Sequence, residues 1–245
     1  MGGREMVGQM KPWAGHSSSV ADTTEICPDR SEHACLTVTA EPAQSARALH
    51  GGMCDDNALP GVLHMRLAAE PDFPALWRLY GDACEEMAGT PHDCEWVMGV
   101  HPTREDLLGA IQAGQLHVAC GVEITGPTPL LGAFVLNGEQ TSGYERAAWP
   151  IDAAPAEVAV IHLLGTAPRA RGRGVARAML THAARLARAQ GARVIRLDVF
   201  ANNAPALALY RSFGFVDIGP HELLLSEGHV RTLNLMELDL ASVAE

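Results

Sequence analysis

A short basic segment, PRARGRGVARAML at residues 168–180, places four arginines and two glycines close together. Glycines allow the backbone to curl so that successive N–H groups point to one side, and the start of a helix adds unpaired N–H donors and a partial positive charge. A continuous apolar run precedes this segment, and an apolar pattern with helical spacing follows Gly174. The sequence therefore predicts a glycine-rich loop between a strand and a helix, and the chemistry expected of it is the binding of phosphate groups.

The positive charge of this loop is local. The chain as a whole has a formal net charge of −11, yet seven of its arginines fall between Arg169 and Arg193. Because an acidic protein repels the phosphate backbone of nucleic acids, we expect no nucleic-acid partner. The patch fits a small anionic ligand better.

Three phosphate-binding signatures can be compared with the loop. A P-loop has a lysine and a hydroxyl residue after its last glycine, but Gly174 is followed by Val175 and Ala176. The dinucleotide fingerprint would place its third glycine at Arg177, where a large side chain would block close packing of helix and strand. The remaining pattern is R/Q-x-x-G-x-G/A, which residues 169–174 match.

This pattern resembles a signature of the GNAT superfamily of acetyl-CoA-dependent N-acetyltransferases. A second segment, DVFANNAPALALYRSFGF at residues 198–215, is similar to the family's N-x-x-A-x-x-L-Y-x-x-x-G-F signature. Two motifs in the right order and at the right separation are more specific than either alone, and the resemblance covers about residues 62–240. It implies an α/β (α+β) fold: a mixed, mostly antiparallel sheet flanked by helices and splayed near its middle, with acetyl-CoA in the gap.

The resemblance also implies which residues would bind acetyl-CoA. Main-chain groups of Leu164 and Thr166 would contact the pantetheine arm and the thioester, and the Asn203 side chain would bond the arm, with Asn202 as a neighbouring alternative. The loop amides would surround the pyrophosphate, while Arg177, Arg185 and Arg188 are expected on a solvated helix face. The full expected coenzyme-binding set is Leu164, Thr166, Arg169, Arg171, Gly172, Arg173, Gly174, Val175, Ala176, Asn203 and Tyr210.

Acetyl transfer to an amine requires a group that takes the ammonium proton and a group that protonates the departing thiolate. The resemblance implies Tyr210 as the acid. Many family members carry a glutamate as the base at the position of Val160, so this chain departs from the family there. His162 shares a strand face with that position and resembles a strand histidine of the arylalkylamine N-acetyltransferases. We expect Tyr210 and His162 to be catalytic; a hydrogen-bonded core histidine is the alternative for His162.

The segment that precedes this strand, residues 138–155, is polar and aromatic. Tyr144, Glu145 and Trp149 lie in it, and an aromatic ring beside a carboxylate would attract a cationic amine. We therefore hypothesise that this segment lines the binding site of the amine acceptor; the alternative is an ordinary surface loop.

Hydrophobic periodicity predicts the elements that position these residues. Thr103 with Asp106 has the spacing of a capping box at a helix start, and Gly114 and Gly191 are expected just after helix ends. Strands are predicted over residues 62–68, 115–124, 130–137, 157–166, 192–200 and 230–240, and helices over 71–87, 103–113, 174–191 and 203–214.

Composition sets the remaining expectations. Residues 1–58 are rich in Gly, Ser and Pro without a sustained period, so we expect a poorly ordered extension there and the GNAT domain over residues 59–245. Six cysteines without CxxC or zinc-finger spacing predict free thiols and no metal. The chain has neither an apolar run long enough for a membrane span nor the apolar core of a secretory signal, so no membrane partner and a cytoplasmic location are expected.

These observations predict an N-acetyltransferase that moves an acetyl group from acetyl-CoA to a primary amine. The acceptor, a small molecule or a peptide, is not readable from the sequence, and a homodimer is left open. The alternative is a non-catalytic acyl-CoA-binding module.

Overall fold

In the part of the chain that the structure describes, eight strands form one sheet, in the order β1-β2-β3-β4-β5-β6-β8-β7. The computed structural model describes residues 36–38, 63–121, 129–225 and 228–243. The strands are β1 (Leu36–Val38), β2 (Leu63–Leu67), β3 (Leu116–Gly121), β4 (Leu130–Asn137), β5 (Val158–Thr166), β6 (Val194–Val199), β7 (Val216–Leu224) and β8 (Val230–Asp239). The helices are α1 (Phe73–Met87), α2 (Arg104–Gln112), α3 (Val175–Ala189) and α4 (Ala204–Phe213).

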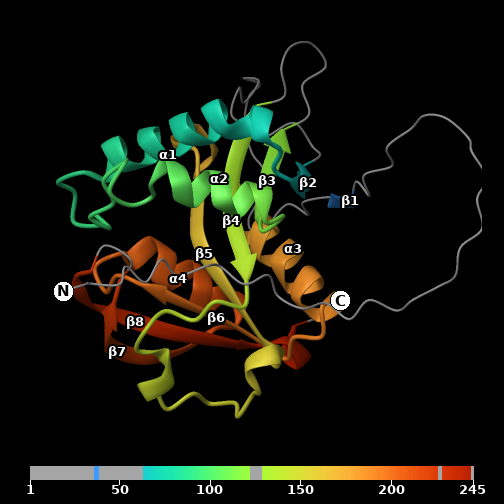
Figure 1. Ribbon diagram of the computed structural model, residues 1–245, viewed down its shortest axis with the longest axis vertical. Coiled ribbons are helices and arrows are strands. Elements are labelled where there is room, and N and C mark those ends of the chain that lie inside the picture. Colours follow the sequence, from blue (N-terminus) through green and yellow to red (C-terminus); the bar gives the residue numbers. More distant parts are fainter. Residues whose placement is uncertain (1–35, 39–62, 122–128, 226–227, 244–245) are drawn as a thin grey trace, which may run out of the picture. The chain divides into compact units, whose positions relative to one another are not determined.

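The sheet opens between β5 and β6. Every pairing of neighbouring strands is antiparallel except this one, which is parallel and joins only residues 158–160 to residues 194–196. Beyond that point β5 continues along β4 and β6 continues along β8. In Figure 1, β4 and β5 run down the centre of the view, while β7 and β8 cross the lower half in a clearly different direction. The predicted mixed, mostly antiparallel, splayed sheet is confirmed.

Helices cover both faces of the N-terminal half of the sheet. A Cβ at Gly132 of β4 would meet the Met179 side chain of α3 at 2.8 Å, whereas a Cβ at Gly165 of β5 would meet the Tyr80 ring of α1 at 3.0 Å. Gly165 is paired with Ala133, the neighbour of Gly132, and successive residues of a strand point to opposite faces. Because α1 and α3 thus lie on opposite faces, β3 and β4 are buried along their whole length.

Local sequence signals account for the helix ends. The Thr103 hydroxyl accepts a hydrogen bond from the Asp106 N–H at 3.0 Å, and the Asp106 carboxylate accepts one from the Thr103 N–H at 2.9 Å. The predicted capping box is therefore confirmed. All four predicted helices and the six predicted strands form, with ends within a few residues of those expected; residues 122–124 of one predicted strand lie outside the described residues.

Two strands were not predicted. β7 contains Gly219 and Pro220 and has a register shift at Asp217, and these residues hide a strand pattern because they are rare inside sheets. β7 is an edge strand, where a missing N–H donor is tolerated. Residues 36–38 lie in the segment expected to be poorly ordered, yet they form β1 and pair with β2. The rest of residues 1–58 lies outside the described residues.

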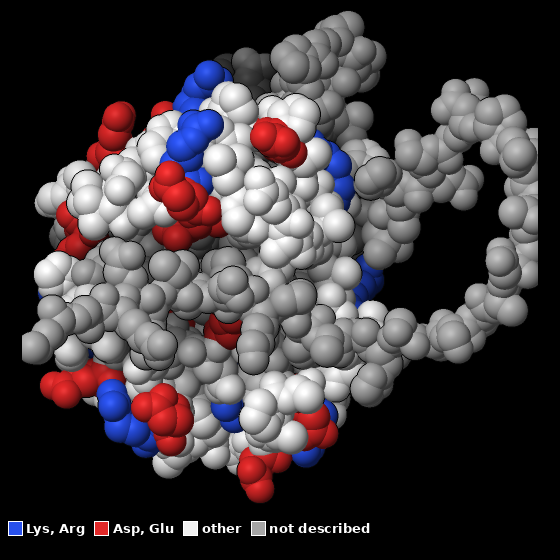
Figure 2. Space-filling view, in the orientation of Figure 1, with Lys and Arg blue, Asp and Glu red and all other residues white. Residues whose placement is uncertain are grey.

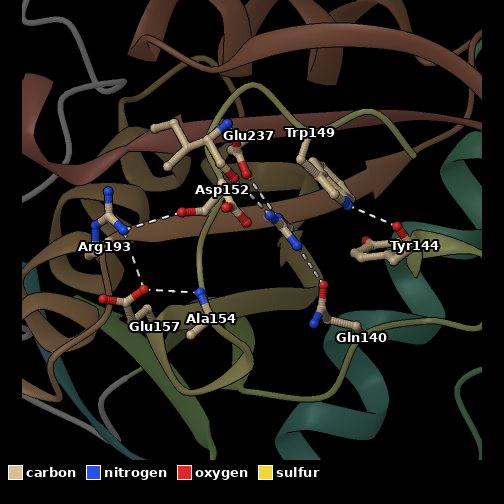
Figure 3. A network of polar contacts seen from close by, with 10 residues as sticks. Gln140, Tyr144, Trp149, Asp152, Ala154, Glu157, Arg193 and Glu237 are labelled. Atoms are coloured by element: carbon tan, nitrogen blue, oxygen red, sulfur yellow. Dashed lines mark hydrogen bonds and ion pairs between the residues drawn. The ribbon is translucent and has the colours of Figure 1, made fainter. Parts of the chain in front are cut away.

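A buried ion pair lies beneath the long segment between β4 and β5 (Figure 3). Arg196 of β6 donates from Nε to Glu237 Oε2 of β8 at 2.9 Å, and the two side chains are only 6% and 1% exposed. The Ile151 N–H donates to the other Glu237 oxygen at 2.8 Å. Arg196 also donates to Gln140 Oε1 at 2.8 Å and lies 4.1 Å from the centroid of the Trp149 ring. The pair therefore fastens this segment to the sheet.

Two histidines are buried against each other between β3 and α3. His117 stacks on Phe134 with centroids 5.1 Å apart, and the His117 and His182 rings are 5.6 Å apart. Neither Nδ1 has a hydrogen-bond partner among the described residues. Burial, together with the His182 ring, lowers the pKa of His117 to about 4. Both rings are therefore accommodated as neutral imidazoles.

Acidification is expected to destabilise the fold through His117. The unfolded chain takes up a proton near an imidazole pKa of about 6.5, whereas folded His117 does so only at about 4. Because the unfolded state binds more protons between these values, stability is lost as the pH falls through this window. The full loss is about 3 kcal/mol. Urea midpoints between pH 7 and 4.5 should therefore fall less steeply for His117→Leu than for wild type, while His229→Leu, at an exposed position, serves as the control. An equally steep fall for His117→Leu would contradict the assignment.

Two further features concern the environment of the protein. Cys84 and Cys94 are free thiols, as predicted, whereas Cys27, Cys35 and Cys54 lie outside the described residues. Among the described residues, no helix is both long and apolar enough to cross a bilayer.

Candidate active site

A cleft of ≈ 1340 Å³ occupies the gap where β5 and β6 part. One wall is the C-terminal part of β5, residues 161–166, and the facing wall is residues 198–200 at the end of β6. The loop before α3 and the first turns of α3 and α4 close one end. The two sequence motifs, separated along the chain, therefore line one cavity.

The loop before α3 has the backbone shape that phosphate binding requires. Gly172 and Gly174 have φ values of +70° and +81°, and a Cβ at either position would meet no protein atom within 4 Å. Gly174 is the N-cap of α3, and its carbonyl accepts the first helical hydrogen bond, from Ala178, at 3.0 Å. Several loop and helix-start N–H groups donate to no backbone carbonyl of the described residues, namely those of Gly172, Gly174, Val175, Ala176 and Arg177. Such unpaired donors beside open space fit the pyrophosphate of the expected coenzyme.

The arginines of the loop have different surroundings. Arg171 lines the cleft and forms an ion pair with Glu86 at 2.7 Å. The Arg169 guanidinium instead donates to the Leu130 carbonyl of β4 at 3.0 Å, and Arg173 donates to the Arg169 carbonyl at 3.3 Å. Neither of these two side chains lines the cleft. Both guanidinium groups bond the backbone, so that coenzyme contacts by the Arg169 and Arg173 side chains stay a prediction.

Two arginines expected on a solvated helix face are not simply solvated. Arg177 lines the cleft, lies over the Phe213 ring at 5.4 Å and donates to the Ser212 carbonyl at 3.4 Å. Arg188 donates to the carbonyls of Leu240 and Val243. Figure 2 shows Lys and Arg side chains interspersed with Asp and Glu on the described part of one face, without a broad basic area there.

The other expected coenzyme contacts lie on the cleft. Leu164 and Thr166 line it on the β5 side and Asn203 on the α4 side. Asn203 is also the N-cap of α4, with Oδ1 accepting from the Ala206 N–H at 3.3 Å. Asn202 points elsewhere, because its amide donates to the Asp93 carbonyl at 2.7 Å. The choice between the two asparagines therefore falls on Asn203.

Tyr210 lies on the cleft wall and is 7% exposed. Burial, reinforced by the Asp198 carboxylate, raises the pKa of its phenol well above the usual value. The phenol is therefore protonated near neutral pH and can donate a proton or a hydrogen bond into the cleft.

His162 also lines the cleft, on the side of β5 that faces the long segment before it. Its Nε2 lies 3.2 Å from Asn137 Oδ1 and 3.0 Å from the Glu139 carbonyl oxygen. Burial lowers the pKa of His162, while the Asp198 carboxylate acts in the opposite direction. A neutral imidazole near neutral pH can accept a proton.

Asp198 of β6 was not identified from the sequence. It lines the cleft, and its Oδ2 accepts hydrogen bonds from the Tyr144 hydroxyl at 2.9 Å and the Thr141 hydroxyl at 3.3 Å. The same carboxylate acts on the pKa of both His162 and Tyr210. A signal existed: two charged residues alternate in an otherwise apolar strand, VIRLDVF, which indicates a polar strand face.

The segment between β4 and β5 contributes to the cleft through other residues than those expected. Tyr144 is 1% exposed and packs against Trp149, whose indole N–H donates to the Tyr144 carbonyl at 2.8 Å (Figure 3). Glu145 is exposed and accepts from the Gly143 N–H. None of the three side chains lines the cleft; residues 139–142 do. The hypothesis that these three receive the amine directly is wrong, because the two aromatic rings fill the core beneath the segment.

The arrangement combines three chemical capacities around one gap. Unpaired N–H donors lie at one end, a protonated phenol lies in the wall, and an imidazole with a nearby carboxylate faces it. Together they can bind an anionic chain, supply a proton and remove one. Among the described residues, no group of three or more His, Cys, Asp or Glu side chains could hold a metal ion.

Comparisons with known proteins agree with this geometry. The family model for the Acetyltransferase (GNAT) family matches residues 65–215. Streptothricin acetyltransferase of Streptomyces lavendulae is 45% identical over 53 residues, a match that spans 22% of this chain and 28% of that relative.

Solved structures show the same fold. A GNAT-family acetyltransferase from Streptococcus agalactiae aligns with a TM-score of 0.56 at 18% identity, over 78% of this chain and 99% of that one. The PaiA N-acetyltransferase of Thermoplasma acidophilum, solved with coenzyme A, aligns with a TM-score of 0.52 at 16% identity, over 72% of this chain and 98% of that one.

Proposed function

Because the chain belongs to the GNAT family of acetyltransferases, we propose that it transfers the acetyl group of acetyl-CoA to a primary amine of a small-molecule or peptide acceptor. The protein is an acyltransferase, and acetyl-CoA is its co-substrate. The observation that best supports the proposal is the joint placement of the glycine loop, Tyr210, His162 and Asp198 around the gap between β5 and β6.

In this proposal the chain's own residues perform three tasks. The N–H groups of Gly172, Gly174, Val175 and Ala176 bind the pyrophosphate, whereas the Arg171 N–H donates to the Pro168 carbonyl at 3.2 Å. The groups that bind the pantetheine arm are those of Leu164, Thr166 and Asn203. This holds the thioester beside the acceptor, and such positioning supplies a large share of the rate.

Two side chains handle protons. His162, with the Asp198 carboxylate nearby, takes the proton from the ammonium, so that the nitrogen lone pair attacks the acetyl carbonyl carbon. As the carbon–sulfur bond breaks, Tyr210 gives its proton to the thiolate. The nitrogen gives its second proton to solvent and thus becomes an amide nitrogen, and the coenzyme leaves as the free thiol. Solvent then takes the proton from His162 and returns one to Tyr210, so that each turnover of an ammonium substrate releases one net proton.

The acceptor is to be found with a panel of amines. Free thiol release would be followed with a chromogenic disulfide reagent, and the signal from the protein's own cysteines is subtracted in a reaction without acetyl-CoA. The panel includes an alkylamine, an arylalkylamine, an α-amino acid, a short peptide and an aminoglycoside, each paired with a secondary amine or an alcohol of the same size. Turnover of primary amines only supports the proposal. Acetyl-CoA binding without turnover of any amine would favour a non-catalytic acyl-CoA-binding module.

Replacing His162 with alanine is expected to reduce kcat by about 10²-fold near neutral pH, because general-base catalysis typically contributes this much. A general base must be unprotonated to act, and burial lowers the pKa of His162. The wild-type rate should therefore fall only at pH values below the usual imidazole pKa, and this fall at acid pH should be absent in the variant. Steady-state rates from pH 5 to 9 test both points. His221→Ala, on β7 outside the cleft lining, is the control. A decrease in kcat smaller than about threefold for His162→Ala would show that His162 is a hydrogen-bonded core residue and not the base.

We propose further that the acetyltransferase domain begins at residue 59 and that the protein acts in the cytoplasm. The free thiols of Cys84 and Cys94 support a reducing compartment.

A further inference from the structure

β5 contains a bulge at the centre of the cleft wall. β4 pairs Ala133 with Gly165 and Val135 with His162, so that two residues of β5 lie opposite one residue of β4. The extra residue is accommodated at Leu163, which has φ +51°. The bulge lies between His162 and the residues expected to meet the acetyl thioester.

The backbone at Leu163 is strained. A residue with a Cβ is strained in the left-handed region, and such conformations persist only where the surroundings hold them. Leu163 lies in a β-strand, where an extended conformation is the unstrained alternative. Some other part of the structure must therefore stabilise the bulge.

Tyr80 of α1 provides this stabilisation. Its hydroxyl donates to the Leu163 carbonyl at 2.7 Å, across 83 residues of sequence. The Tyr80 side chain is fully buried, so its ring cannot turn away, and burial raises the pKa of the phenol far above its usual value. The hydroxyl therefore remains a donor at every working pH.

Gly165 allows the ring to approach the strand. A Cβ at this position would lie 3.0 Å and 3.4 Å from two carbon atoms of the Tyr80 ring, which is closer than side-chain atoms normally pack. The glycine two residues after the bulge is thus needed for the same contact. Two features of β5, the strained Leu163 and the small Gly165, both depend on Tyr80.

The bulge decides which groups of β5 face the gap. An added residue changes the strand register by one, and a shift of one residue turns every following side chain to the opposite face. All four of His162, Leu164, Gly165 and Thr166 line the cleft. Loss of the bulge would therefore turn residues 164–166 to the opposite face of the strand relative to His162.

From these contacts we infer that Tyr80 is a positioning residue for acetyl-CoA: its buried hydroxyl holds the Leu163 bulge and so fixes the direction in which residues 164–166 meet the acetyl thioester. This inference rests on the proposed function, because it assigns the cleft wall to the coenzyme.

Removing one oxygen tests the inference. Tyr80→Phe is expected to raise the Kd of acetyl-CoA by about tenfold in calorimetric titration. Adding Leu163→Gly to Tyr80→Phe should restore most of the affinity, because glycine adopts a positive φ without strain. Trp149→Phe removes another side-chain donor to a backbone carbonyl, that of Tyr144 outside the cleft lining, and should leave acetyl-CoA affinity unchanged.

A second variant tests the same inference without changing Tyr80, in case Tyr80→Phe does not fold. Leu163→Val retains Tyr80 but disfavours a positive φ, because valine is β-branched, and it should weaken acetyl-CoA binding in the same way.

Three results would overturn the inference. Wild-type affinity in Tyr80→Phe would do so, and so would a loss that Leu163→Gly does not repair, because Tyr80 would then act only through packing. Absence of acetyl-CoA binding by the wild-type protein would overturn both this inference and the proposed function, whereas a failure confined to the variants overturns the inference alone.

Discussion

Replacing Gly172 with valine is expected to weaken acetyl-CoA binding by about 10²- to 10³-fold, since it removes two or more charge-assisted hydrogen bonds of about 1.5 kcal/mol or more each. Gly172 has φ +70°, a conformation that a β-branched residue adopts only at high cost. If the backbone moves to a negative φ, the neighbouring N–H groups turn away from the cleft. If it does not, the new side chain enters open space that the coenzyme would occupy.

Calorimetric titration with acetyl-CoA and with coenzyme A measures this loss. Gly191→Val is the matched control, because Gly191 has φ +86°, no protein atom near its missing Cβ, and a place at the other end of α3. Both variants should lose similar thermal stability, but only Gly172→Val should lose coenzyme affinity. Wild-type affinity in Gly172→Val would mean that the loop does not bind the pyrophosphate.

Replacing Glu237 with glutamine is expected to destabilise the protein by about 3–5 kcal/mol, the usual cost of leaving a buried charge without its partner. Arg196 would keep its positive charge while both side-chain positions stay at 6% exposure or less. The hydrogen bond from the Ile151 N–H could be kept by the glutamine oxygen, so the variant removes mainly the charge. The segment fastened by Arg196 should loosen as well.

Urea unfolding at pH 7 measures this effect as a shift in the midpoint. Glu95→Gln removes the same charge from the exposed pair between Glu95 and Arg231, whose atoms are 3.5 Å apart, and should leave the midpoint nearly unchanged. Equal stability of Glu237→Gln and wild type would show that the buried pair does not hold the segment in place.

The sequence predicted most of the fold for a local physical reason. Backbone preferences, caps and hydrophobic periodicity depend on residues a few positions apart, so the capping box at Thr103, the amphipathic helix after Gly174 and the apolar strand before the loop were all predicted. β7 was missed because Gly219 and Pro220 interrupt its pattern, and only its place at the sheet edge makes them tolerable.

The candidate site was predicted in part. The two motifs predicted the glycine loop, Asn203 and Tyr210, and strand alternation predicted the face of His162. The loop motif does not indicate what each arginine side chain contacts. The Arg169 guanidinium, for example, donates to the carbonyl of Leu130, 39 residues earlier in the chain. Asp198 was missed because the alternation of Arg196 and Asp198 in VIRLDVF indicates only a polar strand face, whereas its hydrogen-bond partner Tyr144 lies 54 residues away in sequence.

The sequence by itself therefore determined the order of the elements, the glycine-rich turn before α3 and the family resemblance, because each of these is encoded by neighbouring residues. The tertiary structure alone decided where β5 leaves β6, which side chains the cleft gathers and why Leu163 keeps a strained backbone. These depend on contacts between distant segments, such as the one between Tyr80 and Leu163, and such contacts exist only once the chain has folded.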